Sequence, residues 1–296
     1  MLEPAQLQAL AAILRTGSFD AAAAALHVTP SAISQRLKAL EERLGTVLVS
    51  RGQPARATTA GARLARHFED VQLLEHALAT DLGAELAAER PTVRIAVNAD
   101  SLATWVLPAL AAVPDLLYEL VIDDQDHSAN WLRRGEVQAA VTAHDAPVAG
   151  CDSHPLGQLR CIASASPAFI ARWFADGVTA EALGRAPALT FNEKDRLPTL
   201  WALRVTGRRI APPSHYLASS RGHVDAARLG LGWGMNPEPL IRRDLAAGEL
   251  AALVPDAPLD IALYWQVGRL TGAAMAPLTR AIRAQAASVL LPPVPA

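Results

Sequence analysis

Helix start and stop signals follow one another at the beginning of the chain, and their order constrains the fold more than any other feature. Apolar residues at helical spacing predict a first helix over residues 4–16, and Gly17 stands where a glycine ends a helix. Ser18 is the expected cap of a short, Ala-rich second helix over residues 21–26. His27 and Val28 form a tight connection from the second helix to the element that follows it.

A third helix follows at once. Thr29 and Pro30 combine a capping hydroxyl with a proline in the first turn, which is a strong helix start, and Gly45 marks the end. The polar residues are ordered along this helix, with hydroxyls and an amide first, then Arg36 and Lys38, then an acidic end that we expect to be solvated. The apolar residues predict its buried face: Ala32, Ile33, Leu37, Leu40 and Leu44.

Two short β pieces and a long helix come next. Residues 47–49 and the segment near Thr58 flank a loop rich in Gly, Pro and Arg, which predicts a small wing. Residues 60–88 then carry an apolar stripe with steps of three and four: Leu64, Phe68, Val71, Leu74, Leu78, Leu82 and Leu86. A helix this long with one stripe favours pairing with a second copy of itself; the alternative is packing on its own domain.

These elements together predict an α-helical winged helix-turn-helix domain over residues 1–59 and a linker, or dimerisation, helix over residues 60–90. The charge distribution agrees with a DNA-binding N-terminus. Residues 1–66 carry eight Arg and Lys against four acidic residues, a net of +4, whereas the whole 296-residue chain has a net charge of −2. A basic end on an acidic body is typical of nucleic-acid contact at that end.

Other classes of protein are disfavoured. The chain shows no basic leader, no apolar run of membrane-spanning length and no His pair with metal spacing. Neither a nucleophile elbow nor a dinucleotide-binding glycine motif occurs in a strand–turn–helix setting, so an enzyme is the least expected class. We expect a cytoplasmic protein without metal, cofactor or membrane partner, with Cys151 and Cys161 reduced and buried; a disulfide between them is the less favoured alternative.

The first turns of the third helix are expected to enter the major groove of double-stranded DNA. Short hydroxyls and an amide can reach base edges or phosphates there, and the basic residues of the helix and wing can contact phosphates or a minor groove. The alternative is an amphipathic surface helix with a solvated basic face. The predicted DNA-contact residues are Ser18, Thr29, Pro30, Ser31, Ser34, Gln35, Arg36, Lys38, Arg51 and Arg56.

At this point the sequence resembles a known family. The segments "GSFDAAAAALHVTPSAISQRLKALEERLG" and "LVSRGQPARATTAG" are similar to the DNA-binding domain of LysR-type transcriptional regulators, whose pattern contains GSF-x-AAA, S-x-SA-[VI]-S, LE-x-x-LG and T-x-AG. One departure is visible: many such wings have Phe-x-Arg, whereas here Arg51 follows Ser50. The resemblance covers the whole chain. It implies a two-lobed α/β effector domain, like a periplasmic binding protein, after the linker helix.

The second half of the chain narrows the resemblance. The segments "RIAVNADSLATWVLPAL", "VIDDQDHSANWLRRGEVQAAVT" and "GLGWGMNPE…LYWQ" resemble a basic-amino-acid-responsive branch. That branch includes the lysine-export regulator of corynebacteria and the arginine- and lysine-responsive regulator once called an inhibitor of chromosome initiation. It implies a homodimer or homotetramer that binds promoter or operator DNA. Its expected effector is lysine or arginine, its target an amino-acid exporter gene, and RNA polymerase is a further partner such a regulator can contact.

After residue 90, strand and helix patterns alternate, which predicts an α/β domain in a multi-domain chain. The predicted strands are 92–97, 116–122, 137–142, 159–164, 187–191, 215–218, 231–235 and 261–266. The predicted helices are 102–112, 128–134, 167–175, 198–206, 222–229, 238–247 and 273–290. We expect the chain to cross between lobes near 163–166 and return near 264–267. Within the effector domain, 91–296, lobe I is then 91–164 with 267–296, and lobe II is 165–266.

Ligands of such folds bind between the lobes, at strand ends and helix N-termini. Ser101 is expected to cap a helix whose N–H groups hold a ligand carboxylate, with Trp105 as a wall of the cleft. Three acids, Asp123, Asp124 and Asp126, follow the second strand, and a cationic ligand would offset their mutual repulsion. The predicted effector residues are Asn98, Ser101, Thr104, Trp105, Asp123, Asp124, Thr142 and Asn192.

Each of these assignments has a structural alternative. Ser101 can cap without binding a ligand, Trp105 can be a core residue, and the acids can lie on a solvated loop. Trp233 and Trp265 are expected to pack. For the whole protein, two alternatives to basic-amino-acid sensing stay open. One is a regulator of the same family with a different small-molecule effector. The other is an architectural, nucleoid-type DNA-binding protein.

Overall fold

The computed structural model describes residues 2–50, 52–83, 90–124 and 126–293. It divides into two compact units, Met1–Val93 and Arg94–Ala296. Within the described residues, no helix is both long enough and apolar enough to cross a membrane.

The first unit begins with the three predicted helices, α1 (Pro4–Thr16), α2 (Phe19–Ala25) and α3 (Pro30–Leu44). The predicted stop signals are confirmed, because Gly17 and Gly45 adopt left-handed φ values of 69° and 66° at the ends of α1 and α3. The start of α3 is confirmed as well, since the Thr29 hydroxyl accepts a hydrogen bond from the Ala32 N–H at 3.2 Å. Helix α2 starts two residues earlier than predicted, directly after its cap Ser18.

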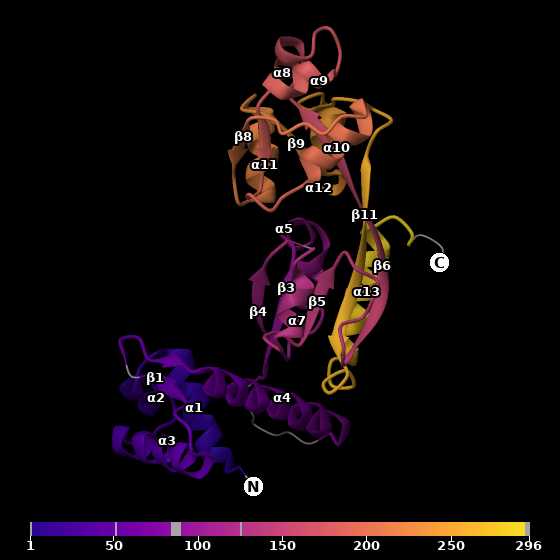
Figure 1. Cartoon of the computed structure of the whole chain (residues 1–296). Helices are drawn as coiled ribbons and strands as arrows, with labels where there is room; N and C mark the ends of the chain where they lie inside the picture. The colour runs from indigo at the N-terminus through magenta and orange to yellow at the C-terminus, as the bar shows by residue number, and fades with distance from the viewer. Residues whose placement is uncertain (1, 51, 84–89, 125, 294–296) are drawn as a thin grey trace. The chain divides into compact units, whose positions relative to one another are not determined.

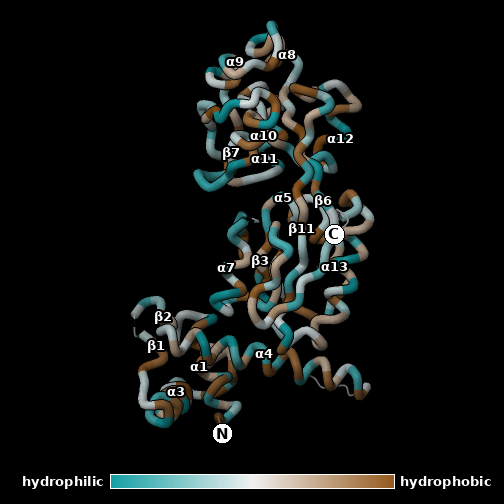
Figure 2. Tube along the Cα trace, turned by 45° about the vertical axis from the view of Figure 1, so that its right-hand side comes forward, coloured by the Kyte–Doolittle hydropathy of each residue, from teal (hydrophilic) through white to brown (hydrophobic). Residues whose placement is uncertain are grey.

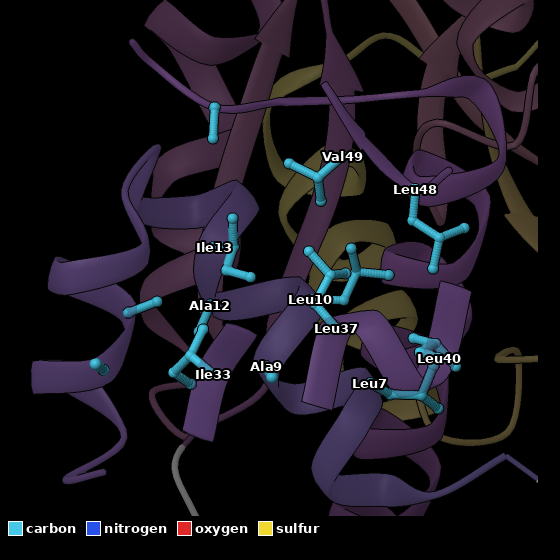
Figure 3. Close-up of a cluster of buried hydrophobic side chains, with 13 residues drawn as sticks. Leu7, Ala9, Leu10, Ala12, Ile13, Ile33, Leu37, Leu40, Leu48 and Val49 are labelled. Carbon is cyan, nitrogen blue, oxygen red and sulfur yellow. The ribbon is translucent and has the colours of Figure 1, made fainter. Parts of the chain in front are cut away.

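The three helices enclose one apolar core, shown in Figure 3. Its buried residues are Leu7, Ala9, Leu10, Ala12, Ile13, Ala22, Ala23, Ile33, Leu37, Leu40, Leu48, Val49 and Ala55. The predicted face of α3 is therefore confirmed at Ile33, Leu37 and Leu40. It is wrong at Leu44, which is 40% exposed because it is the last residue of the helix.

The acidic end of α3 was predicted to be solvated, and this is wrong for Glu41. Its carboxylate accepts hydrogen bonds from the N–H groups of Leu48 at 2.8 Å and Val49 at 3.4 Å. These N–H groups belong to the chain that enters the wing strand β1 (Val49–Ser50), which pairs with β2 (Arg56–Ala57). Glu41 thus fixes the wing to the helix that carries the predicted DNA contacts.

The wing is joined to helix α4 (Thr59–Asp81) through the T-x-A-G segment. The Thr58 hydroxyl donates to the carbonyl of Val47 at 2.8 Å and accepts from the Gly61 N–H at 3.1 Å, so it caps α4 and holds the wing at once. A Cβ on Gly61 would lie 1.9 Å from the Leu48 carbonyl oxygen. Glycine is required at this position because the start of α4 lies so close to the Leu48 backbone.

Helix α4 is described as far as Asp81, whereas the predicted helix extended to residue 88; residues 84–89, with Leu86, lie outside the described residues. Apolar and polar residues alternate along it (Figure 2). Leu64 and Phe68 of the predicted stripe pack against the helical core. The next part of the stripe is exposed: Leu74 by 36%, Leu78 by 59% and Leu82 by 73%.

The second unit contains one sheet with strand order β4-β3-β5-β11-β6-β9-β7-β8, and β10 pairs with β6. Its strands are β3 (Thr92–Val97), β4 (Leu117–Ile122), β5 (Ala139–Thr142), β6 (Cys151–Ala165), β7 (Ala188–Thr190), β8 (Ser214–Tyr216), β9 (Trp233–Pro237), β10 (Ala251–Ala252) and β11 (Leu259–Gly268). The predicted strands are recovered, but β6 is much longer than 159–164 and β10 was missed.

The helices of this unit are α5 (Ala99–Ser101), the π-helical turn η1 (Leu102–Val106), α6 (Leu107–Ala111), α7 (Ser128–Arg133), α8 (Pro167–Trp173), α9 (Ala180–Arg185), α10 (Leu197–Thr206), α11 (Ser220–Arg228), α12 (Glu238–Ala247) and α13 (Ala276–Val289). Helix α9 was not predicted. The helix predicted over 102–112 begins earlier, at Ala99, and its residues 102–106 form the π-helical turn. Cys151 and Cys161 are both free and buried, as expected.

Strands β6 and β11 connect the two lobes of the sheet. They pair antiparallel from Leu259 opposite Cys161 to Gly268 opposite Cys151, and Figure 1 shows them as two long neighbouring strands. β11 also pairs with β5 of the first lobe, and β6 with β9 of the second. The lobes are therefore joined by continuous strands. The sequence pattern did not predict that β6 is long enough to run through both lobes.

Candidate functional site

A cleft in the second unit is lined by residues from both lobes. They follow the ends of β3, β4 and β7, or lie on α11 and β9. The lining residues are Asn98, Ala99, Asp100, Asp123, Asp124, Phe191, Asp195, Leu197, His223 and Met235. Four of them are aspartates and none is lysine or arginine, so the cleft is strongly acidic.

Asp100 is the most perturbed of these acids, and sequence reasoning missed it. It lies in the short helix α5, and its carboxylate accepts a hydrogen bond from the Ser220 hydroxyl of the other lobe at 2.5 Å. Burial raises the pKa of Asp100 to about 6; the Ser220 bond opposes this rise, while the charges of Asp195 and Asp124 add to it. Near neutral pH the cleft therefore holds a carboxylate that lacks a full compensating charge.

Asp123 has the opposite environment. The indole N–H of Trp131 donates to its carboxylate at 2.9 Å, and so does the Asp124 backbone N–H at 2.9 Å. The Lys194 ammonium of the other lobe lies 3.5 Å away. Partial burial acts to raise the pKa of Asp123, but these two bonds and the lysine charge outweigh it and hold the pKa below its ordinary value. Asp123 is thus already paired within the protein.

Asp124 and Asp195 complete the acidic lining. Burial raises the pKa of Asp124, with the charges of Asp126 and Asp195 adding to the rise and the Asp126 N–H bond and His127 opposing it. The Asp195 carboxylate accepts from the backbone N–H groups of Phe191 and Leu197, each at 3.0 Å, which fixes its position in the loop between β7 and α10. A ligand that carries positive charge is the one that relieves the repulsion among these groups.

The structure places the residues predicted near β3 in different roles. Asn98 is buried and lines the cleft. Ser101 was expected to cap the helix, and this is wrong, because the helix starts at Ala99 and Ser101 is fully buried inside it. Thr104 donates its hydroxyl to the Asp100 carbonyl at 2.7 Å, a bond within the helix. Trp105 was expected as a wall; it is fully buried and absent from the lining, which agrees with the packing alternative.

The two remaining effector predictions, Thr142 and Asn192, do not line the cleft. Thr142 is fully buried, and its hydroxyl donates to the His144 carbonyl at 3.1 Å. The Asn192 side chain accepts from the Lys194 N–H at 2.8 Å and so shapes the loop before Asp195. Asp195 could have been found by the argument used for Asp123, since it also follows a strand closely. Asp100 had no such signal, because an acid in the first turn of a helix is ordinary.

The predicted DNA-contact residues lie on the surface of the first unit, where they are exposed in most cases. Pro30, Ser31, Ser34, Gln35 and Lys38 share the exposed face of α3, together with the exposed N-cap Thr29. Arg36 and Ser18 are half-buried, and Arg56 is exposed on β2. Arg51 lies outside the described residues. The Lys38 ammonium is 3.6 Å from the Glu42 carboxylate in an exposed pair that contributes little to stability.

The fold and the cleft define a class of protein, in which a winged helix-turn-helix domain is joined to a two-lobed ligand-binding domain. Residues 4–62 match the bacterial regulatory helix-turn-helix protein, lysR family, and residues 87–287 match the LysR substrate binding domain. The chain belongs to the LysR family of transcriptional regulators.

Relatives at high identity carry regulator names. The chain is 45% identical to the HTH-type transcriptional regulator LysG of Mycobacterium tuberculosis (strain ATCC 25618 / H37Rv), over 97% of this chain and 95% of that protein. The crystal structure of ArgP from Mycobacterium tuberculosis matches with a TM-score of 0.81 and 44% identity, over 99% of this chain and 100% of that one. Full-length LysG from Corynebacterium glutamicum with bound effector Arg matches with a TM-score of 0.69 and 39% identity, over 98% and 100%.

Proposed function

We propose that this protein is a transcription regulator that binds promoter DNA through its winged helix-turn-helix domain and senses lysine or arginine in the cleft of its second unit. The acidic lining of the cleft is the observation that supports the sensing of a basic amino acid. Asp100 and Asp124 have raised pKa values, and Asp195 is fixed beside them. The relative that carries bound Arg supports the same ligand class.

The ligand class follows from charge. A small organic acid would add a negative charge to a site that already holds four aspartates, so it would bind only after protonation of several of them. A basic amino acid brings two cationic groups and one carboxylate. The cations can face Asp100, Asp124 and Asp195.

The DNA half rests on the exposed first turns of α3. Ser31, Ser34 and Gln35 present short polar groups on a helix whose other side is buried in the core. Arg56 on the wing and Lys38 further along the helix supply positive charge for phosphates. DNA lies in the cytoplasm of a bacterial cell, so we infer that location, and we infer no catalytic activity. An amino-acid exporter gene is the regulated target that we propose.

We also propose that α4 pairs with α4 of a second copy. Leu74, Leu78 and Leu82 recur every four residues and are exposed in the single chain. A homodimer, or a homotetramer built from two such pairs, would cover this stripe and place two α3 helices on one DNA site.

The proposal is tested by fluorescence anisotropy on the DNA upstream of the protein's own gene, with and without lysine or arginine. We expect nanomolar binding to that DNA, a clear preference over unrelated DNA, and a change in affinity on adding either amino acid. Equal affinity for unrelated DNA would instead indicate an architectural protein. Specific binding without any response to basic amino acids would favour a different effector.

The division between base and phosphate contacts predicts two different mutant phenotypes. Gln35→Ala removes a group that can read a base edge, so the preference for the specific site should fall by about 1–3 kcal/mol. Arg56→Ala removes a phosphate contact, so binding should weaken on all DNA and the salt slope should fall by about one. Arg185→Ala, an exposed arginine of the second unit, is the charge-matched control. Identical behaviour of all three variants would contradict the assignment.

The variant Asp124→Asn tests whether the acidic cleft binds a cation, and a neighbouring aspartate provides the control. The change keeps the size of the side chain and removes its charge, so arginine affinity should fall about 10- to 100-fold, as for loss of a charged hydrogen bond of about 1.5–3 kcal/mol. Asp126→Asn is the control, because Asp126 is exposed and does not line the cleft. Calorimetric titration measures both. An unchanged arginine affinity in Asp124→Asn would contradict a contact between Asp124 and the cation.

A further inference from the structure

His223 lines the cleft and its imidazole is buried, but it is not one of the acidic groups that attract a cation. It lies on α11, three residues after Ser220, and it is 7% exposed. The ring of Phe191 meets it edge-on at 6.4 Å between centroids. Within the described residues, its Nε2 atom is buried and has no hydrogen-bond partner.

The surroundings of the ring indicate which nitrogen carries the proton. Burial lowers the pKa of His223, and the Asp195 charge and hydrogen bonds with the main chain of Leu217 and Thr190 oppose this only in part. A main-chain bond that favours the protonated ring is one that the ring donates. Because Nε2 has no partner, that donor is Nδ1. The neutral ring therefore offers a lone pair on Nε2 as an acceptor.

The charged groups around the cleft do not supply a donor for this atom. Asp100, Asp124 and Asp195 are acceptors when ionised, and Asp123 is paired with the Lys194 ammonium. A buried acceptor without a donor is costly in a folded protein. In a cleft that takes a cationic ligand, the ligand's own N–H groups are the natural donors.

We propose that Nε2 of His223 accepts a hydrogen bond from a cationic nitrogen of the bound amino acid. This inference rests on the proposed function of the cleft. An uncharged acceptor orients one nitrogen without adding to the repulsion among the four carboxylates. Protonation of the ring would replace the acceptor with a donor of the same charge as the ligand, so His223 also makes binding sensitive to acid.

The test is calorimetric titration of the whole chain and two variants with lysine, arginine, Nα-acetyl-lysine and Nε-acetyl-lysine. His223→Gln can place an amide oxygen near the position of Nε2, whereas His223→Leu has no acceptor. We expect His223→Leu to bind lysine about tenfold or more weakly, from the loss of one charge-assisted bond. His223→Gln should retain most of the affinity. The deficit of the Leu variant should shrink with the acetylated ligand whose contacted nitrogen has lost its positive charge, because a neutral hydrogen bond is weaker than a charge-assisted one.

The outcomes separate this inference from the proposed function. If the wild-type protein binds neither lysine nor arginine, the proposed function fails. If the wild-type protein binds and His223→Leu binds equally well, the His223 contact is refuted and the proposed function stands. Equal losses in the Gln and Leu variants with every ligand would also refute it, since packing would then be the cause. Thermal unfolding checks each variant, and His223→Asn, which keeps a donor on the Nδ1 side, replaces a Leu variant that does not fold.

Discussion

Asp100→Asn is expected to produce a protein that is more stable and responds poorly to its effector. The amide keeps the size of the side chain and can still bond to the Ser220 hydroxyl, but it removes a carboxylate whose pKa is raised to about 6. Arginine affinity should fall about 10- to 100-fold, because a charged contact contributes about 1.5–3 kcal/mol. At pH 7 the free energy of unfolding should rise by about 3 kcal/mol, the cost of ionising this group inside the fold.

The pH dependence of this effect has a definite sign. The folded pKa of Asp100 lies above its unfolded value, so ionisation destabilises the folded state above about pH 6 and ceases to do so near pH 4. The stability difference between variant and wild type should therefore shrink as the pH falls through that range. Chemical denaturation at pH 7 and pH 4.5 measures it. A difference that is constant with pH would contradict the assigned ionisation.

The same group makes effector binding dependent on pH. A bound cation favours ionised Asp100, so binding releases a proton, and arginine affinity should rise from pH 5 to pH 7.5 in the wild type. The lowered pKa of His223 acts in the same direction, because acid adds a positive charge to the cleft. Asp100→Asn should show a weaker rise. Titration in two buffers of different ionisation enthalpy counts the protons released.

Leu78→Glu is expected to separate the paired chains. The side chain is 59% exposed in the single chain and lies between Leu74 and Leu82 in the stripe. Full burial of a leucine contributes about 1.5–3 kcal/mol, and a pair of helices related by symmetry loses this contribution twice while it gains two like charges. We expect monomers at micromolar concentration and DNA affinity lower by about 100-fold, because the two DNA-binding domains are no longer linked.

Thr80→Glu is the matched control for this variant. It places the same charge on the same helix, at an exposed position more than half a turn from Leu78. Analytical ultracentrifugation of both variants measures the oligomeric state. Dissociation by both changes would point to a general effect of charge on α4, and dissociation by neither would contradict the proposed pairing.

Much of the DNA-binding unit was predictable because its signals are local. Caps such as Thr29 and Gly45 act on the residues beside them, so their positions in the sequence determine where α3 starts and stops. The role of Glu41 was not predictable in this way, since its bond to Leu48 depends on how the chain folds back after the helix. The same holds for Gly61. Only glycine fits at this position because α4 comes close to the Leu48 carbonyl, which is distant in the sequence.

The cleft was predicted only in outline for a similar reason. Asp123 and Asp124 form a visible acidic cluster after a strand, and both line the cleft. Asp100 and Asp195 are far apart in the sequence, and they meet only because β6 and β11 bring the two lobes together. Ser101 was wrongly predicted to cap the helix. Asn98 and Ser101 are both residue types that cap helices well, so the sequence alone does not show at which of them the helix starts.

The central claim is that the cleft recognises positive charge on an amino-acid side chain. Calorimetric titration of the full-length wild-type protein with arginine, lysine and citrulline tests it most directly, because citrulline has nearly the shape of arginine without the charge. We predict measurable binding of arginine and lysine, and for citrulline an affinity lower by about tenfold or more. Equal affinity for arginine and citrulline, or no heat with either basic amino acid, would contradict the account.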